Sequence, residues 1–208
     1  MHVIGGVVMR VLVACEESQR VCMAFRDRGH IAFSCDLQDC SGGFPQYHIK
    51  GDCKSVIESH SWDLIIAHPP CTYLSRVSAV CLCNADGTIK DYQRYDKMLA
   101  AREFFMYLYN LEGIRLCIEN PIPMKLCNLP PYSQVIQPYE FGDEYTKKTL
   151  LWLKNLPYLM PLNYGARNRS LPGLKSWTLI HSDAKNRSKT FPGIASAMAT
   201  QWGCLSSL

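Results

Sequence analysis

Short apolar runs alternate with amphipathic stretches over the first part of the chain. The run at 10–15 is apolar after its first residue, and the run at 64–67 is apolar throughout. Such uninterrupted runs are typical of parallel strands that are buried on both faces. Hydrophobic spacing over about 18–28 predicts a helix, which Gly29 ends.

The remaining elements follow from the same two signals. The polar stretch at 76–90 is expected to be a long loop over the sheet edge, and 157–192 shows little periodicity. The two predicted strands at 135–137 and 149–153 are expected to be antiparallel neighbours. We predict further strands at 31–36, 48–52, 63–68, 114–119, 135–137 and 149–153, and helices near 54–60, 92–111 and 193–202.

Five alternations of strand and helix predict an α/β fold with a Rossmann-like, doubly wound, mostly parallel sheet. Right-handed crossovers then bring the loops that follow the parallel strands to one edge of the sheet. A length of 208 residues suits a single domain over 1–208. A short basic loop region is expected before the closing helix.

Composition narrows the class of protein only modestly. A hydrophobic content of 48% with 19% charged residues describes an ordinary globular chain. The net charge of +4 tolerates a polyanionic partner without arguing for one. The 11 cysteines are odd in number and contain no CxxC pair, which predicts free thiols in a reducing cytoplasm and no metal site. We also expect no leader and no membrane span.

Polar side chains stand at every predicted strand end. Carboxylates at the first three ends suit the hydroxyls and amines of a nucleoside-like cofactor, although Glu16 and Asp36 taken singly would be ordinary helix caps. The first turn has neither GxGxxG nor a P-loop, so the cofactor should lack phosphate, and S-adenosylmethionine meets that restriction. The strand-end residues are Cys15, Glu16, Ser18, Asp36, Asp52, His68, Cys71 and Glu119.

Cys71 directly follows Pro69 and Pro70 at the end of a predicted strand. The prolines fix φ and remove two backbone donors, so the loop is stiff and the thiol is held in place. Open α/β sheets bind ligands at this edge, which makes Cys71 a candidate nucleophile. The alternative is an incidental, half-buried cysteine in a stiff loop.

The segment Pro69-Pro70-Cys71-Thr72-Tyr73-Leu74-Ser75 resembles the PPCQxFS nucleophile motif of DNA cytosine-C5 methyltransferases. Ile118-Glu119-Asn120-Pro121 resembles their ENV motif, 139–150 aligns with the segment that carries QxRxR, and 192–203 resembles the helix that completes the cofactor pocket. The short phage-type members of the family are the most similar. The resemblance implies a sheet of the class I methyltransferase type.

The resemblance also implies roles for these residues. Cys71 would attack C6 of cytosine, and Glu119, protonated or sharing a proton, would bond N3. C5 would then take the methyl group of S-adenosylmethionine. Asp36 would hold the ribose and Asp52 the adenine amine of this cofactor. The remaining cofactor residues would be Cys15, Glu16, Ser18, His68 and Pro69, and DNA or a free cytosine nucleotide would be the substrate.

Three features depart from the family pattern. Bulky and acidic residues replace the glycine-rich first turn. In the QxRxR segment, Tyr145, Lys147 and Thr149 stand for the Gln and the two Arg, so Lys147 offers the pyrimidine carbonyl a flexible point charge. A reduced insertion at 154–190 stands where the family has a large target-recognition domain. Its basic residues, interleaved with Tyr164 and Trp177, suit phosphate contact or a solvated loop. They are Arg167, Arg169, Lys175, Lys185, Arg187 and Lys189.

Other functions compete with cytosine-C5 methylation. Amino-methylation would need Asp, Asn or Ser before the two prolines, where this chain has His68. An enzyme that modifies a free pyrimidine nucleotide would use the same thiol chemistry and need no recognition domain. A degenerate protein that binds nucleic acid or nucleotide would need no thiol beside a carboxylate.

Overall fold

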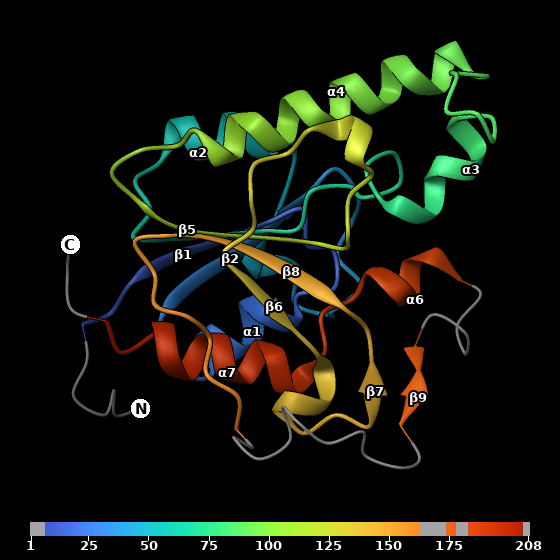
Figure 1. Ribbon diagram of the computed structural model, residues 1–208. Helices are drawn as coiled ribbons and strands as arrows, with labels where there is room; N and C mark the ends of the chain where they lie inside the picture. The colour runs from blue at the N-terminus through green and yellow to red at the C-terminus, as the bar shows by residue number, and fades with distance from the viewer. Residues whose placement is uncertain (1–6, 163–173, 178–182, 206–208) are drawn as a thin grey trace.

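A computed structural model describes residues 7–162, 174–177 and 183–205 of the chain. Within them, a sheet of seven strands has the order β3-β2-β1-β4-β5-β8-β6 (Figure 1). A separate two-stranded sheet pairs β7 with β9. The strands are β1 (Arg10–Ala14), β2 (Ile31–Asp36), β3 (His48–Lys50), β4 (Leu64–Ala67), β5 (Arg115–Asn120), β6 (Gln134–Ile136), β7 (Tyr145–Thr146), β8 (Thr149–Lys154) and β9 (Lys175–Ser176).

The first five strands run parallel, and β8 runs antiparallel to both of its neighbours. The predicted α/β class and mostly parallel sheet are therefore confirmed, as is the antiparallel pairing of the last two predicted strands. One reversed strand, β8, lies between β5 and β6 in this order. The parallel pairing places the carboxyl ends of β1, β2, β4 and β5 at one edge.

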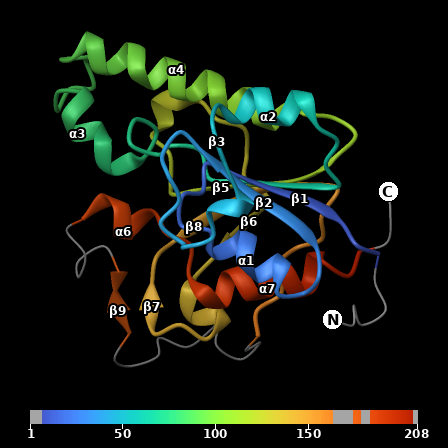
Figure 2. The same ribbon diagram turned by 180° about the vertical axis from the view of Figure 1, so that it is seen from behind.

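Helices cover both faces of the sheet (Figures 1 and 2). α2 and α4 lie on one face, and α1 packs with α7 on the other. The helices are α1 (Arg20–Arg26), α2 (Cys53–Ser59), α3 (Ala79–Leu82), α4 (Tyr92–Tyr109), α6 (Ala184–Ser188) and α7 (Pro192–Trp202), with 3-10 turns η1 (Pro45–Tyr47), η2 (Arg76–Ser78), η3 (Lys125–Cys127) and η4 (Pro138–Phe141).

The central strands are buried on both faces, as their sequences predict. Val11 to Ala14 of β1 and all of β4 are fully buried. Their alternating side chains feed two hydrophobic clusters, one under α1 and α7 and the other under α2 and α4. Since the chain moves from one side of β1 to the other between β3 and β4, the sheet has its topological switch point at the ends of β1 and β4.

The stretch at 76–90 differs from the predicted loop, because it contains η2 and α3. Leu82 is fully buried there, and the Ser78 hydroxyl donates to Thr72 O at 2.6 Å. These anchors lie among polar neighbours, so the hydrophobic pattern is too sparse to signal a helix. The small sheet of β7 and β9 was also not predicted, since two-residue strands leave no periodicity.

α7 is set against η4 by a close backbone approach at Gly193. The Gly193 amide donates to Asp143 Oδ2 at 3.2 Å, and a Cβ added at Gly193 would lie 2.1 Å from Phe141 O. Only a residue without Cβ allows this approach. The contact fixes the start of α7, and with it the position of Thr190 near the end of β5.

We predict that Gly193→Ala lowers the free energy of unfolding by about 3 kcal/mol, because the backbone must move to admit the methyl group. Urea unfolding monitored by circular dichroism measures the change. Gly51→Ala is the matched control, since nothing lies within 4 Å of its added Cβ, and it should stay within about 0.5 kcal/mol of wild type. Equal stability of the two variants would contradict the prediction.

Candidate functional site

The loop that carries Cys71 is tied to the end of β5. The Asn120 side chain donates to Pro69 O at 3.0 Å, and Leu74 O accepts from Met124 N at 2.7 Å. The amide of Ser75 donates to Cys71 O at 2.9 Å, which closes a turn around the cysteine. The two segments that carry the nucleophile motif and the Glu119 motif therefore lie side by side.

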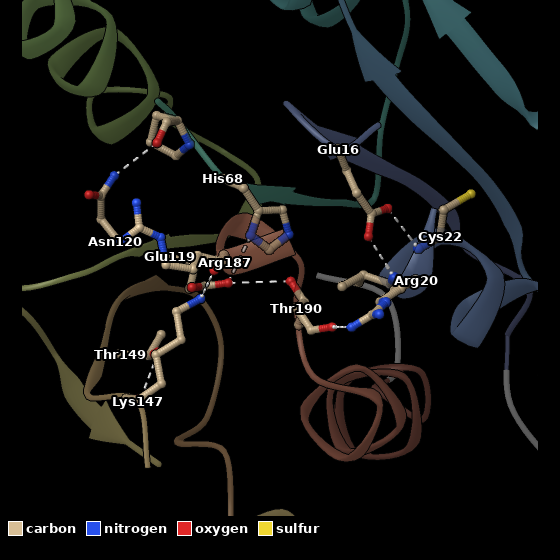
Figure 3. Close-up of polar contacts among 12 residues, drawn as sticks. Glu16, Arg20, Cys22, His68, Glu119, Asn120, Lys147, Thr149, Arg187 and Thr190 are labelled. Carbon is tan, nitrogen blue, oxygen red and sulfur yellow. Dashed lines mark hydrogen bonds and ion pairs between the residues drawn. The ribbon is translucent and has the colours of Figure 1, made fainter. Parts of the chain in front are cut away.

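His68 and Glu119 form a buried pair at the ends of β4 and β5 (Figure 3). His68 Nδ1 lies 2.9 Å from Glu119 Oε2, and their side chains are 11% and 10% exposed. The Thr190 hydroxyl lies 3.4 Å from the same Oε2. Glu119 therefore has one oxygen held by two neighbours from separate parts of the chain.

The surroundings of the pair shift its two pKa values in opposite directions. Burial alone would lower the pKa of His68, but the hydrogen bond and charge of Glu119, with the charge of Glu16, raise it above 6.5. Burial alone would raise the pKa of Glu119, but His68 and Lys147 lower it below 4.5. A permanently protonated Glu119, which the resemblance allows, is not the form that these surroundings favour. The shared-proton form agrees with them.

Cys71 is half-buried and lies in the field of three charged residues. Burial raises the pKa of its thiol, and the charge of Glu119 raises it further, whereas Lys147 and Arg187 lower it. Lys147 is held in turn, because its Nζ donates to Arg187 O at 2.8 Å and its amide donates to Gln137 Oε1 at 2.9 Å. The three predicted catalytic residues, Cys71, Glu119 and Lys147, thus come together.

Glu16 lies in the turn before α1. Its carboxylate accepts from Val21 N at 2.7 Å and from Cys22 N at 3.2 Å (Figure 3). It therefore bonds first-turn amides of the helix, as a cap does, although the N-cap position itself is Gln19 and not Glu16 as predicted. Burial raises the pKa of Glu16 above 4.5. Ser18 lies beside this carboxylate. The amides that would hold an anionic ligand at this helix are therefore taken by the chain itself.

The other predicted cofactor residues line the same edge. Asp36 is half-buried, and its Oδ1 accepts from Gln38 N at 2.9 Å. Asp52 is exposed and caps α2 through Lys54 N at 3.2 Å. Cys15 lies after β1 with its Sγ 3.8 Å from the Sγ of Cys53. No grouping of three or more His, Cys, Asp and Glu side chains suited to a metal ion occurs among the described residues.

These residues fit a nucleoside-type cofactor that lacks phosphate. Asp36 uses Oδ1 in its own turn, which leaves Oδ2 for a ribose hydroxyl. His68 Nε2 is buried without a hydrogen-bond partner in the described part of the chain. It could therefore donate a hydrogen bond to an acceptor group of a ligand. Because Glu16 covers the α1 amides, a pyrophosphate has no cradle here. Cys15, Ser18 and Pro69 would frame such a ligand.

Sequence reasoning missed two contributors to the site. Thr190, 71 residues further along the chain, contacts Glu119 through its hydroxyl. Arg20 Nη1 donates to Thr190 O at 2.9 Å. No local pattern signals either contact. Arg187 was predicted only as one of several basic residues for phosphate contact, yet it lies close enough to Cys71 to affect its thiol. Tyr164, Arg167 and Arg169 lie outside the described residues.

A pocket of about 220 Å³ opens at the opposite edge of the sheet, lined in part by Met9, Trp62, Asp63 and Arg115. It contains no cysteine or histidine. The reactive side chains converge at the carboxyl edge instead, so we assign the candidate site there. No helix in the described part of the chain has both the length and the apolar composition that crossing a membrane requires.

No protein-family model matches the sequence, and no curated protein does. Among solved structures, one similar to this chain is a prophage-encoded protein of E. coli, provisionally described as a DNA modification methyltransferase. The TM-score is 0.45 at 12% sequence identity, over 70% of this chain and 46% of that one. This chain thus spans about half the length of that protein.

We predict that Glu119→Gln lowers the free energy of unfolding by about 3 kcal/mol between pH 4.5 and 6.5, because it leaves a buried imidazolium unpaired. The pair stabilises the fold fully between the ordinary pKa values of Glu and His. Its contribution is lost as pH rises through the raised pKa of His68, and as pH falls through the lowered pKa of Glu119. Urea unfolding at a series of pH values measures this window.

Glu58→Gln is the control for this experiment, since Glu58 is an exposed glutamate that accepts from Tyr107 OH at 3.1 Å. It should change stability by less than about 0.5 kcal/mol. A loss in Glu119→Gln that is constant from pH 4 to 9 would contradict the paired state.

Proposed function

We propose that this protein transfers a methyl group from S-adenosylmethionine to C5 of cytosine in DNA, through a covalent adduct with Cys71. The observation that carries the proposal is the convergence of a half-buried thiol, a buried carboxylate and two cations at one sheet edge. The resemblance of the 69–75 and 118–121 segments to cytosine-C5 methyltransferases names the reaction for which this convergence is suited.

Cys71 supplies the nucleophile in this proposal. Its thiol must lose a proton before it attacks C6, and the charges of Lys147 and Arg187 favour the thiolate against the effect of burial. Addition at C6 breaks the conjugation of the ring and makes C5 an enamine-like nucleophile. The stiff Pro69-Pro70 loop holds the sulfur at a fixed place for this attack.

Glu119 and Lys147 stabilise the charge that develops on the ring. A proton shared within the His68–Glu119 pair is available to N3, and the Lys147 ammonium offers a point charge to the pyrimidine carbonyl. A base removes the C5 proton after methyl transfer, and Cys71 then leaves as thiolate. This division of roles uses all three residues that the resemblance predicts as catalytic.

S-adenosylmethionine, when bound, supplies a methyl group on a sulfonium centre, which is the electrophile that C5 requires. Asp36 would bind the ribose hydroxyls, and His68 Nε2 would donate to an acceptor group of the methionine portion. Cys15, Glu16, Ser18 and Pro69 would surround that portion, with Asp52 near the adenine amine. Neither charge nor hydrogen bonding at these positions requires a phosphate.

A duplex substrate must have its cytosine flipped out of the stack to reach Cys71. The 154–190 insertion is short, so few side chains are available to read base sequence, and we expect modest sequence selectivity. The same shortness favours a free cytosine nucleotide as the alternative substrate. A degenerate binding protein is the other alternative, and both are outcomes of the following experiment.

We predict that the protein with S-adenosylmethionine forms 5-methylcytosine in DNA, and that Cys71→Ala lowers the rate about a thousandfold or more. Mass spectrometry of the digested DNA measures the product. Cys81→Ala, which removes an exposed thiol, is the control and should retain activity. Product on cytosine nucleotides but not on DNA would support the alternative substrate, and no product on either would leave a binding protein.

We further predict that Asp36→Asn weakens binding of S-adenosylmethionine about tenfold or more, because a charged hydrogen bond to the ribose is lost. Isothermal titration calorimetry measures the change without turnover. Asp39→Asn is a matched control, since Asp39 is exposed and pairs with Lys50 at 2.9 Å. Equal affinities of the two variants would remove Asp36 from the cofactor site.

A further inference from the structure

We propose that His68 is a positioning residue that stores the proton used at N3 of the pyrimidine, and that Glu119 carries this proton between His68 and the ring. The inference rests on the proposed cytosine chemistry and extends it, because the resemblance assigns His68 to the cofactor site alone. It explains why a histidine stands directly before the Pro69-Pro70-Cys71 loop.

The hydrogen bonds of Glu119 separate its two oxygens. Oε2 faces His68 Nδ1 at 2.9 Å and the Thr190 hydroxyl at 3.4 Å. Oε1 has no hydrogen bond among the described residues, and the side chain keeps 10% of its surface exposed, so we take Oε1 as the oxygen left for a ligand. Figure 3 shows His68 and Thr190 on one side of the carboxylate, with Lys147 reaching toward it from another. The carboxylate is thus held on one side and open on the other.

Burial makes the pair a proton store. Both side chains are about nine-tenths buried, and two such groups are stable together only when the proton between them is retained. The charged groups that face His68 are Glu119 from β5, Glu16 from the turn after β1 and Lys147 from the segment before β8. Two carboxylates against one ammonium favour the protonated imidazole.

The proton balance follows from this arrangement. As the Cys71 thiolate forms its bond to C6, the ring gains an electron pair and N3 accepts a proton. The N–H bond at His68 Nδ1 breaks as an O–H bond forms at Glu119 Oε2. Rotation of the carboxyl group then turns this O–H toward the ring, where it breaks as the N3–H bond forms. His68 is then neutral. When the carbon–sulfur bond at C6 breaks, N3 returns the proton by the same route.

The test uses a partial reaction that needs no cofactor. Reversible addition of Cys71 to C6 allows C5 to exchange its hydrogen with water, so DNA and cytosine nucleotide labelled with tritium at C5 release the label. The active form needs the Cys71 thiolate together with the protonated His68. Because the pKa of the thiol is raised above 9.0, release should rise with pH as the thiolate fraction grows and level off where His68 loses its proton. This rising limb should end above pH 6.5, the ordinary value for His.

His68→Asn keeps a donor for Glu119 Oε2 but cannot store a proton. Its rising limb should end at least about one pH unit lower, since Glu119 alone must then hold the proton, and release at pH 8 should fall about tenfold. Thr190→Val is the matched control, because it removes the other hydrogen bond to Oε2 without removing a titrating group. It should lower the rate and leave the limb in place.

A His68→Asn variant with a reduced rate but an unmoved rising limb would overturn the proposal, because His68 would then only support the structure. A wild type that releases no tritium from either substrate would overturn the proposed function and the positioning role of His68 together.

Histidine NMR distinguishes these failures from loss of the pair itself. The protein has 6 histidines, and the signal lost in His68→Asn identifies the relevant one. Its pKa should lie above 6.5 in the wild type and fall by at least about one unit in Glu119→Gln. An unchanged pKa would show that no proton store exists.

Discussion

Parallel pairing of β1, β4 and β5 is the constraint on which the rest of the structure depends. Because all three strands are buried and run the same way, their carboxyl ends meet at one edge. The side chains of the candidate site either follow these strands at that edge or contact it from other parts of the chain. His68 and Glu119 stand one residue beyond the last paired positions of β4 and β5, Ala67 and Ile118, so register alone brings them side by side.

Burial converts this adjacency into chemistry. A histidine and a glutamate at a wet surface would titrate independently near their ordinary pKa values. At this edge their pKa values move in opposite directions, because each charge favours the charged form of the other. The same burial makes Cys71 a weaker acid, and Lys147 and Arg187 offset this effect only in part, so the pKa of the thiol stays raised. Glu119 and Lys147 therefore affect both the pKa of His68 and the pKa of the Cys71 thiol.

The first turn shows how a chain can keep this architecture without a glycine-rich loop. Glu16 turns back on the amides of α1, so the chain provides its own anion where other α/β proteins bind a phosphate. Gly42 lets the next loop approach closely, since an added Cβ would lie 2.6 Å from Ser18 O. The result is a covered turn, and His68 Nε2 is left as the buried donor beside it.

The sequence by itself determined the fold class, the positions of the main strands along the chain and the expectation that Cys71 and Glu119 share one sheet edge. Buried strands carry strong apolar patterns, and the position of a residue at a strand end follows from them. Tertiary structure alone decided that His68 pairs with Glu119, that Thr190 reaches the same oxygen, and that Glu16 bonds first-turn amides of α1. These contacts join residues far apart in the chain or depend on side-chain direction, and no local periodicity records either.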